Sequence, residues 1–266
     1  MKLVSIIIPT LGAGDYVEKC VQSIHDKVKR DDYEIIVVDD GSEKEDHNKL
    51  LKLSKKLDFI LVRNSENSGF GSAIRLGLTT AGATSYKLFL NDDTEADNDF
   101  VSIMIDRYQG TPKCGVVGAK LLYPNRTIQF AGHVRNPFSP KWFDHLHRGQ
   151  AENFLTANKA RKAIGITGAC FLVHENVLKM VEESYGHYGF DPRYVMAFED
   201  IDFCFKVRKL GYDCWYEPAA VVIHKEGGTR GVSVEPKAGP NQMLSLNAFW
   251  ELWTEEEVDE LCKLAY

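Results

Sequence analysis

The sequence predicts an α/β fold in which a mostly parallel sheet is flanked by helices, and two observations lead to this prediction. First, apolar runs of strand length alternate with amphipathic helical segments through the first 114 residues. Second, polar and acidic residues stand directly after these runs, where an open sheet of this kind binds its ligands. Beyond residue 115 the alternation loosens, so we expect a mixed second half.

Each element of the first half follows from its hydrophobic period. The expected order is a strand at 3–9, a helix at 15–28, a strand at 34–39, a helix through 50–57, a strand at 59–62, a helix at 71–80 and a strand at 86–90. The first three of these form a βαβ unit. In the second half, apolar runs stand at 116–122, 166–173 and 219–223.

Polar side chains follow four of the expected strands. They are Thr10 after the first, Asp39 and Asp40 after the second, Asn64 after the third, and Asn91, Asp92 and Asp93 after the fourth. Because the carboxyl ends of parallel strands meet at one edge of the sheet, we expect a nucleotide crevice there.

The acidic cluster at Asp92 and Asp93 predicts a divalent metal site. Adjacent like charges at the end of a buried strand cost free energy unless a cation or a buried partner compensates them.

A second acidic cluster, Glu199, Asp200 and Asp202, opens a helical stretch. The helix dipole keeps a carboxylate ionised at that position, which suits a general base. A metal and nucleotide site together with a base are what transfer of a group from an activated nucleotide donor requires.

Composition excludes several classes of protein. The 266 residues are 44% hydrophobic and 26% charged, which is ordinary for a globular chain. A formal net charge of -6 gives no general attraction to nucleic acid. The six cysteines form no CxxC pair, which favours a reducing cytoplasm. No apolar stretch reaches the ~18 to 20 residues of a membrane span, and the apolar start is too short for a signal sequence. Peripheral contact with the inner face of the membrane stays open.

Seven short motifs occur in an order that resembles inverting family 2 glycosyltransferases of the GT-A fold, especially their rhamnosyltransferase-like branch. They are SIIIPT at 5–10, VVDDGS at 37–42, NSGFG at 67–71, LNDDT at 90–94, TGAC at 167–170, EDID at 199–202 and IH at 223–224. The resemblance implies one GT-A domain over 1–266, with a nucleotide-binding half at 1–114, an acceptor-binding half at 115–231 and a C-terminal helical tail at 232–266.

The resemblance also assigns the nucleotide site. Asp39 would accept a hydrogen bond from the imide N–H of uracil or thymine, a donor that only an acceptor can pair with. Asp92 would lie near the ribose, and Pro9 and Thr10 would complete this side. The alternative is that residues 39–42 form only a turn of favoured composition.

A glycine-containing loop is assigned to the nucleotide as well. Asn67 and Gly69 belong to the loop in which glycine lets the backbone approach the ligand. Arg75 stands where relatives commonly carry asparagine, and it either meets the diphosphate or lies on the solvent side of its helix. Lys225 and Arg230 are candidates for binding the diphosphate, although basic loop residues are usually only solvated.

For the chemistry, the resemblance assigns the metal contact to Asp93 and the catalytic base to Asp200. Mn²⁺ or Mg²⁺ would bridge Asp93 and the diphosphate. His224 resembles an additional ligand found in some members, against the alternative of a structural histidine. Asp200 would take the proton of the acceptor hydroxyl, which implies inversion at the anomeric carbon. Glu199 would steer the acceptor or share the base role.

The expected substrates are a dTDP- or UDP-sugar, with rhamnose as the first expectation, and a glycan or lipid-linked acceptor of polysaccharide biosynthesis. Asp202 is expected to be a dipole or capping partner. The aromatic stretch at 125–161 is either a loop that orders over the site or a surface excursion. Thr254 and Glu257 predict a capping box before a short helix that packs against the body, with an oligomer or membrane contact as the alternative.

Three other functions are alternatives. A non-catalytic module that binds nucleotide sugars would be expected to lose either the metal acid or the base, and both are present. A sugar-nucleotide pyrophosphorylase would need a long glycine-rich loop with Arg and Lys after the first strand, which the sequence lacks. A dinucleotide enzyme is suggested by Gly12 and Gly14, but Val17 stands where the third glycine belongs.

Overall fold

The computed structural model describes residues 2–12, 14–227 and 239–263. The strands are β1 (Val4–Thr10), β2 (Tyr33–Asp39), β3 (Ile60–Arg63), β4 (Tyr86–Leu90), β5 (Thr94–Ala96), β6 (Cys114–Leu122), β7 (Ile128–Phe130), β8 (His133–Arg135), β9 (Phe143–His145), β10 (Arg161–Ala163), β11 (Cys170–His174) and β12 (Asp213–His224). The helices are α1 (Gly14–Lys27), α2 (Lys44–Leu57), α3 (Phe70–Thr80), α4 (Phe100–Gly110), α5 (Glu175–Tyr185), α6 (Glu199–Lys209), α7 (Pro240–Leu252) and α8 (Glu255–Lys263), with a 3-10 turn η1 (Leu155–Asn158).

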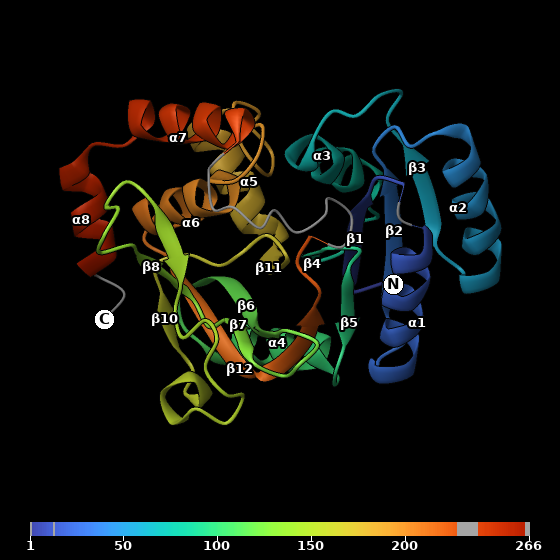
Figure 1. Cartoon of the computed structure of the whole chain (residues 1–266), viewed down its shortest axis with the longest axis horizontal. Coiled ribbons are helices and arrows are strands. Elements are labelled where there is room, and N and C mark those ends of the chain that lie inside the picture. The colour runs from blue at the N-terminus through green and yellow to red at the C-terminus, as the bar shows by residue number, and fades with distance from the viewer. Residues whose placement is uncertain (1, 13, 228–238, 264–266) are drawn as a thin grey trace.

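One sheet runs through both halves in the order β10-β12-β6-β11-β4-β1-β2-β3, with β5 paired to β12 and β7 to β6. The first half is parallel, because β1 pairs in parallel with β2 and β4, and β2 with β3. Figure 1 shows this half on the right, with α1 and α2 beside the sheet and α3 above it. The predicted α/β class and the parallel first half are confirmed.

Close packing of α3 on the sheet depends on a glycine. A Cβ added to Gly77 would lie 2.3 Å from Cγ2 of Ile7, so any larger side chain there would push α3 away from β1. This contact sets how closely α3 packs on β1 and β2, because the same Cβ would also lie 3.2 Å from Cγ2 of Val38.

The second half mixes strand directions, which explains why the alternation of the sequence loosens there. β11 is antiparallel to both β4 and β6, whereas β12 runs parallel to β6. Pairing of β11 with β4 joins the two halves, since Cys170 faces Leu90 at the carboxyl end of β4. This junction lies next to both acidic clusters.

Residues 125–161 form several short regular elements and not one irregular loop, and a role over the bound substrate stays a prediction. They form β7, the β8–β9 hairpin, η1 and the start of β10, and β7 and β10 join the main sheet. The stretch lacks periodicity because its strands have only three residues each and depend on partners far away in the sequence.

The tail packs on the body through a second apolar cluster that includes Phe198, Phe205, Phe249 and Trp253. The capping box is confirmed, because the Thr254 and Glu257 side chains accept from each other's backbone N–H groups at 3.2 and 3.1 Å. Among the described helices, none is both long and apolar enough to cross a bilayer.

Candidate active site

The ends of β1 and β4 meet through a direct hydrogen bond. Thr10 Oγ1 donates to Asp92 Oδ2 at 2.6 Å, and both side chains are buried. Pro9, the preceding residue of β1, is buried as well. The bond fixes one oxygen of the Asp92 carboxylate against the neighbouring strand.

Asp39, at the end of β2, is fully buried and held from three directions. Oδ1 accepts from the backbone N–H of Ser42 at 2.9 Å, so the carboxylate does shape the turn that follows. Oδ2 lies 2.6 Å from Nδ1 of His47 and 3.6 Å from Nε of Arg63. These contacts orient the carboxylate and compensate its charge, and each oxygen retains a further lone pair for a ligand donor.

Asp40 organises the loop that leads into α3. Its Oδ1 accepts from Asn64 Nδ2 at 2.7 Å and from Ser68 N at 3.1 Å, while Oδ2 accepts from Gly69 N at 2.8 Å. Gly69 has a φ of +86°, which favours glycine, and its N–H also faces Asn67 Oδ1 at 3.2 Å. Asp40 thus holds the predicted nucleotide loop against the end of β2.

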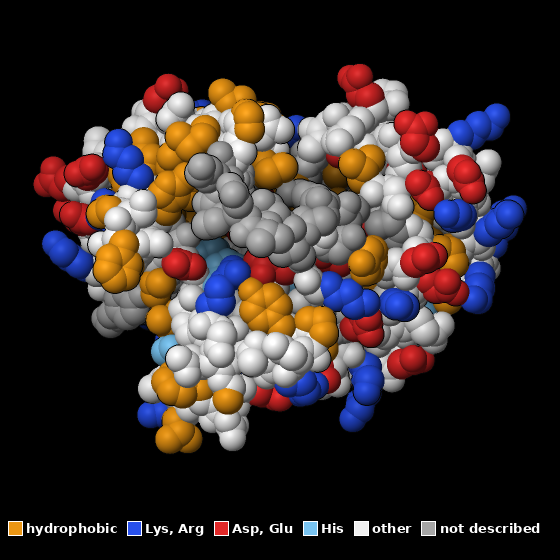
Figure 2. All heavy atoms as spheres, in the orientation of Figure 1, with side chains coloured by type: hydrophobic (Ala, Val, Ile, Leu, Met, Phe, Trp, Pro, Cys, Tyr) orange, Lys and Arg blue, Asp and Glu red, His pale blue; other side chains and the backbone are white. Residues whose placement is uncertain are grey.

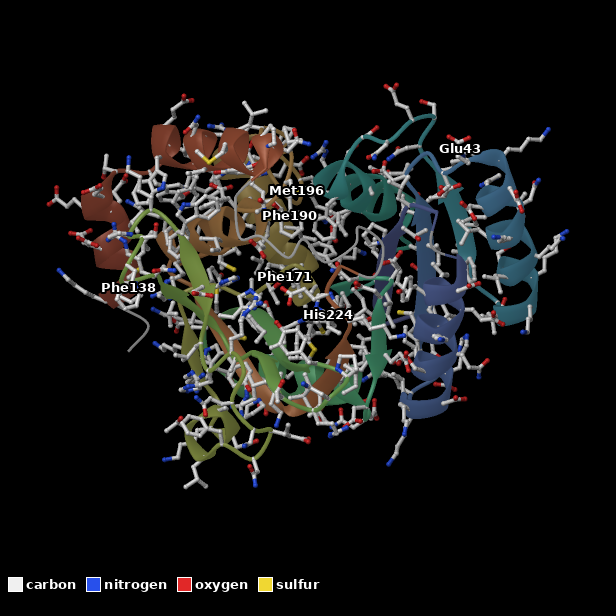
Figure 3. All side chains as sticks on the ribbon, in the orientation of Figure 1. Glu43, Phe138, Phe171, Phe190, Met196 and His224 are labelled. Carbon is white, nitrogen blue, oxygen red and sulfur yellow. The ribbon has the colours of Figure 1, made fainter. Side chains whose placement is uncertain are left out.

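The metal candidates Asp93 and His224 lie together. Asp93 follows β4 and His224 ends β12, and Oδ1 of the acid is 3.0 Å from Nε2 of the imidazole. Asn91 Nδ2 is 3.3 Å from the same nitrogen. Figure 3 shows His224 in the middle of the molecule, between the elements of the two halves.

Gln129 on β7 determines the tautomer of His224, that is, which of its two ring nitrogens carries the proton. Its amide nitrogen faces the carbonyl oxygen of His224 at 3.4 Å, so Oε1 accepts from His224 Nδ1–H at 2.6 Å. With the proton on Nδ1, Nε2 presents its lone pair towards the carboxylate. In a neutral imidazole this arrangement places a nitrogen lone pair and a carboxylate oxygen 3.0 Å apart, and both atoms can bind one divalent cation, so the residues fit a metal site.

Asp200 lies in the first turn of α6 and faces the junction of the two halves. Oδ2 accepts from Gly168 N at 2.9 Å, and Oδ1 accepts from Ile201 N at 2.8 Å. Burial raises the pKa of Asp200, but nearby His133 and these two N–H groups outweigh it and hold the pKa below its usual value. The carboxylate is therefore ionised at neutral pH.

The backbone before α6 is held in an unusual conformation. Ala197 and Phe198 have φ values of +66° and +70°, a left-handed conformation that side chains rarely adopt. Ser245 of α7 fixes the preceding residues, because its Oγ accepts from Val195 N at 3.1 Å and Met196 N at 3.0 Å. The C-terminal tail thus supports the turn that aims Asp200.

Backbone contacts connect the two acidic clusters. Asn91 N donates to Ala169 O at 3.1 Å, and the adjacent Gly168 N–H binds Asp200. Figure 2 shows acidic and histidine side chains near the middle of the face that it presents to the viewer. A separate surface hollow of about 460 Å³, lined in part by Thr84, Lys87 and Lys179, includes the start of β4 and none of these residues.

Other predicted residues have structural partners. Arg75 Nη1 donates to Phe190 O at 3.4 Å, so its guanidinium reaches the second half. Lys225 Nζ pairs with Glu95 at 2.8 Å, and its backbone N donates to Asp93 O at 3.1 Å. Glu199 is buried at the start of α6. Arg230 lies outside the described residues.

Of the two roles expected for Asp202, the capping role is wrong, because α6 has no side-chain cap hydrogen bond, whereas its place in the acidic first turn agrees with a dipole partner. Asp202 is fully buried, and its Oδ2 lies 2.7 Å from Lys206 Nζ. The same ammonium is 2.7 Å from Asp191 Oδ2 and 2.9 Å from His187 Nε2. These three side chains have the ligand types of a metal site, but Lys206 occupies the space between them, so the group is an internal ion-pair cluster.

Sequence reasoning missed four polar residues that surround the predicted ones. They are His47 and Arg63 beside Asp39, Gln129 beside His224, and His133 beside Asp200. None belongs to one of the seven motifs. Gln129 alone carries a local signal, because it is a polar residue between two apolar ones, Ile128 and Phe130, in β7.

The family described as "Glycosyl transferase family 2" matches residues 5–179. The match covers more than half of the chain, and this protein therefore belongs to glycosyl transferase family 2.

Two relatives match most of the chain. Protein y4gI of Sinorhizobium fredii is 30% identical over 240 residues, and the O-antigen biosynthesis protein RfbC of Myxococcus xanthus is 27% identical over 240 residues. Each alignment covers 88% of this chain, but only 26% and 18% of the respective relative. The chain thus spans about a quarter or less of these relatives.

Solved structures confirm the GT-A glycosyltransferase fold. GalNAc-T7 with UDP, GalNAc and Mn²⁺ aligns with a TM-score of 0.71 and 16% identity, over 97% of this chain and 50% of that one. The mannosyltransferase PcManGT of Pyrobaculum calidifontis, in complex with GDP-Man and Mn²⁺, aligns with a TM-score of 0.60 and 16% identity, over 98% of this chain and 73% of that one.

Proposed function

We propose that this protein is a metal-dependent inverting glycosyltransferase that moves a sugar from a nucleotide donor to a hydroxyl of a glycan or lipid-linked acceptor. One observation carries the proposal. Asp93 with His224, and Asp200 with Gly168, adjoin the same junction of β4 and β11. A cation and diphosphate at the first pair would therefore lie beside a base at the second.

The proposed donor is a dTDP- or UDP-sugar, with rhamnose as the first sugar to test. Asp39 would accept the imide N–H of uracil or thymine, and its contacts with His47 and Arg63 hold it in place for that role. RfbC acts in O-antigen biosynthesis, which favours a polysaccharide product. PcManGT binds GDP-Man on the same fold, so guanine belongs in the donor panel.

The proposed metal is Mn²⁺ or Mg²⁺, held by Asp93 and His224, and GalNAc-T7 and PcManGT contain Mn²⁺. Carboxylate oxygen and a neutral imidazole nitrogen suit Mn²⁺ in particular. When bound, the cation neutralises charge on the departing diphosphate.

In the proposed reaction, Asp200 takes the proton of the acceptor hydroxyl while its oxygen forms a bond to the anomeric carbon. The bond between that carbon and the diphosphate oxygen breaks, and the electron pair leaves with the nucleoside diphosphate. Attack from the face opposite the leaving group inverts the configuration. The lowered pKa keeps Asp200 ionised and ready to accept the proton.

We further propose one domain with a nucleotide-binding half at 1–114, an acceptor-binding half at 115–231 and a tail at 232–266. The proposed location is the cytoplasm, where nucleotide sugars are used and where the six free cysteines would stay reduced. Contact with the inner face of the membrane would bring a lipid-linked acceptor to the site.

The test is a transfer assay with Mn²⁺ and a donor panel of dTDP-rhamnose, UDP-glucose, UDP-GlcNAc, UDP-GalNAc and GDP-mannose. Acceptors are the p-nitrophenyl glycosides of rhamnose, glucose, GlcNAc and galactose. We expect nucleotide release that requires Mn²⁺ and one of these acceptors, and a product of inverted anomeric configuration by NMR. Tight donor binding without turnover on the whole panel would instead favour a non-catalytic binding module.

A further inference from the structure

His133, on β8, is a buried histidine that none of the sequence motifs includes. Only 6% of its surface is exposed, and within the described residues neither ring nitrogen has a hydrogen-bond partner. Its Nε2 lies 3.8 Å from Oδ2 of Asp200, which is close but longer than a hydrogen bond. A carboxylate oxygen of the proposed catalytic base thus lies close to this histidine.

Packing fixes the imidazole in this position. The ring lies edge-on to the rings of Phe130 and His145, with 5.1 Å between ring centroids in each case. The backbone N–H of His133 donates to Gly165 O at 3.2 Å. His145, unlike His133, has hydrogen-bond partners, because its Nδ1 lies 3.1 Å from Gln129 O and 2.8 Å from Arg148 Nη2. His133 is therefore held by apolar contacts and its backbone, and its nitrogens stay available.

Buried polar groups are almost always paired in folded proteins, because an unpaired one loses its hydrogen bonds to water and gains nothing. The unpaired Nε2, 3.8 Å from the carboxylate of Asp200, therefore points to a ligand group that hydrogen-bonds to it. The ligand must offer a group small enough to enter between Nε2 and Oδ2.

We propose that His133 Nε2 and Asp200 Oδ2 together hold the attacking hydroxyl of the acceptor. An oxygen at about 2.8 Å from each atom fits a separation of 3.8 Å. The hydroxyl donates its proton to Oδ2 and accepts from Nε2–H. Nε2 thereby gains the hydrogen-bond partner that it lacks, and Oδ2 accepts a second hydrogen bond. Gly168 N–H fixes Oδ2 from its other side at 2.9 Å. This assignment rests on the proposed transferase function and adds a catalytic residue that touches the reacting oxygen.

The test compares three substitutions of one residue. His133→Phe keeps an aromatic ring among Phe130 and His145 but removes both nitrogens. His133→Gln carries an amide N–H near the position of Nε2, whereas His133→Asn carries it near the position of Nδ1. Steady-state kinetics are measured with Mn²⁺, the active donor and the best p-nitrophenyl glycoside of the panel, and the affinity for UDP with Mn²⁺ is measured by calorimetry.

We expect His133→Phe and His133→Asn to lower kcat/KM for the acceptor at least about tenfold, with UDP affinity and melting temperature near those of the unsubstituted protein. His133→Gln should recover most of the lost activity. Equal loss in all three variants, or unchanged acceptor kinetics in His133→Phe, would overturn the role of His133 and leave the transferase function standing. Absence of transfer by the unsubstituted protein on the whole panel would overturn the transferase function, and this assignment with it.

Discussion

Replacement of Gln129 by leucine should weaken metal binding although Gln129 is not itself a predicted ligand. The amide oxygen is the acceptor that keeps the proton of His224 on Nδ1, at 2.6 Å, and Gln129 is almost completely buried. Without it, Nδ1–H is buried without a partner, and the tautomer with the proton on Nε2, facing Asp93, becomes competitive. Loss of such a supporting contact typically costs 10- to 100-fold in metal affinity, equivalent to about 1.4–2.7 kcal/mol.

The assay is a titration of Mn²⁺ followed by electron paramagnetic resonance, with and without UDP. Gln129→Glu is the matched variant, because a carboxylate still accepts from Nδ1–H and should retain Mn²⁺ affinity. Gln109→Leu, on the exposed side of α4, is the control for a glutamine-to-leucine change remote from the site. Equal Mn²⁺ affinity in Gln129→Leu and the unsubstituted protein would refute the orientation of His224 by Gln129.

Two further predictions concern the frame of the site. Gly41 has a φ of +81°, and a Cβ there would lie 2.3 Å from the carbonyl carbon of Glu66, so Gly41→Ala should lower both melting temperature and UDP affinity, and full UDP affinity would contradict this. Lys206→Met should cost about 3 kcal/mol in urea unfolding at pH 7, because it removes the ammonium that lies 2.7 Å from each of two buried carboxylates, Asp191 and Asp202. Burial raises the pKa of Asp191, but Lys206 and Arg193 together outweigh it and lower that pKa to about 2, while burial raises the pKa of Asp202. Without the lysine the folded-state pKa of Asp202, already raised by burial, rises further above its unfolded value, so the deficit should shrink as pH falls from 7 to 5; a constant deficit would contradict the account.

The strands that position the first acidic cluster could be predicted because they are local features of the sequence. β1, β2 and β4 are continuous apolar runs, and Asp39 and Asp93 stand at or just after their ends. A parallel sheet then brings these ends to one edge without further information. The expected bounds agree with the structure within a residue or two for these strands.

The partners of those acids could not be predicted, because long-range pairing places them. Gln129 reaches His224 only because β7 pairs with β6 and β6 pairs with β12. His133 reaches Asp200 from a three-residue strand in a stretch without periodicity. Short strands of this kind carry too little local pattern to fix their register or direction.

For the second acidic cluster, the position at a helix start could be predicted, but the contacts that keep Asp200 ionised could not. The helix start at Glu199 is confirmed, and the sequence alone attributes the ionised state of Asp200 to the helix dipole. In the structure, His133 and the N–H groups of Gly168 and Ile201 hold its pKa low against burial. Gly168 comes from the turn before β11, a contact that no spacing within α6 reveals.

The central claim is that the metal acid and the base have separate tasks at one junction, and Asp200→Asn tests it most directly. The substitution keeps the shape of the side chain and removes the proton acceptor. We expect Mn²⁺ and UDP affinity equal to those of the unsubstituted protein, with transfer lowered by at least about 100-fold. Asp93→Asn should instead weaken Mn²⁺ binding. Undiminished transfer by Asp200→Asn, with the acceptor that the unsubstituted protein uses, would contradict the account.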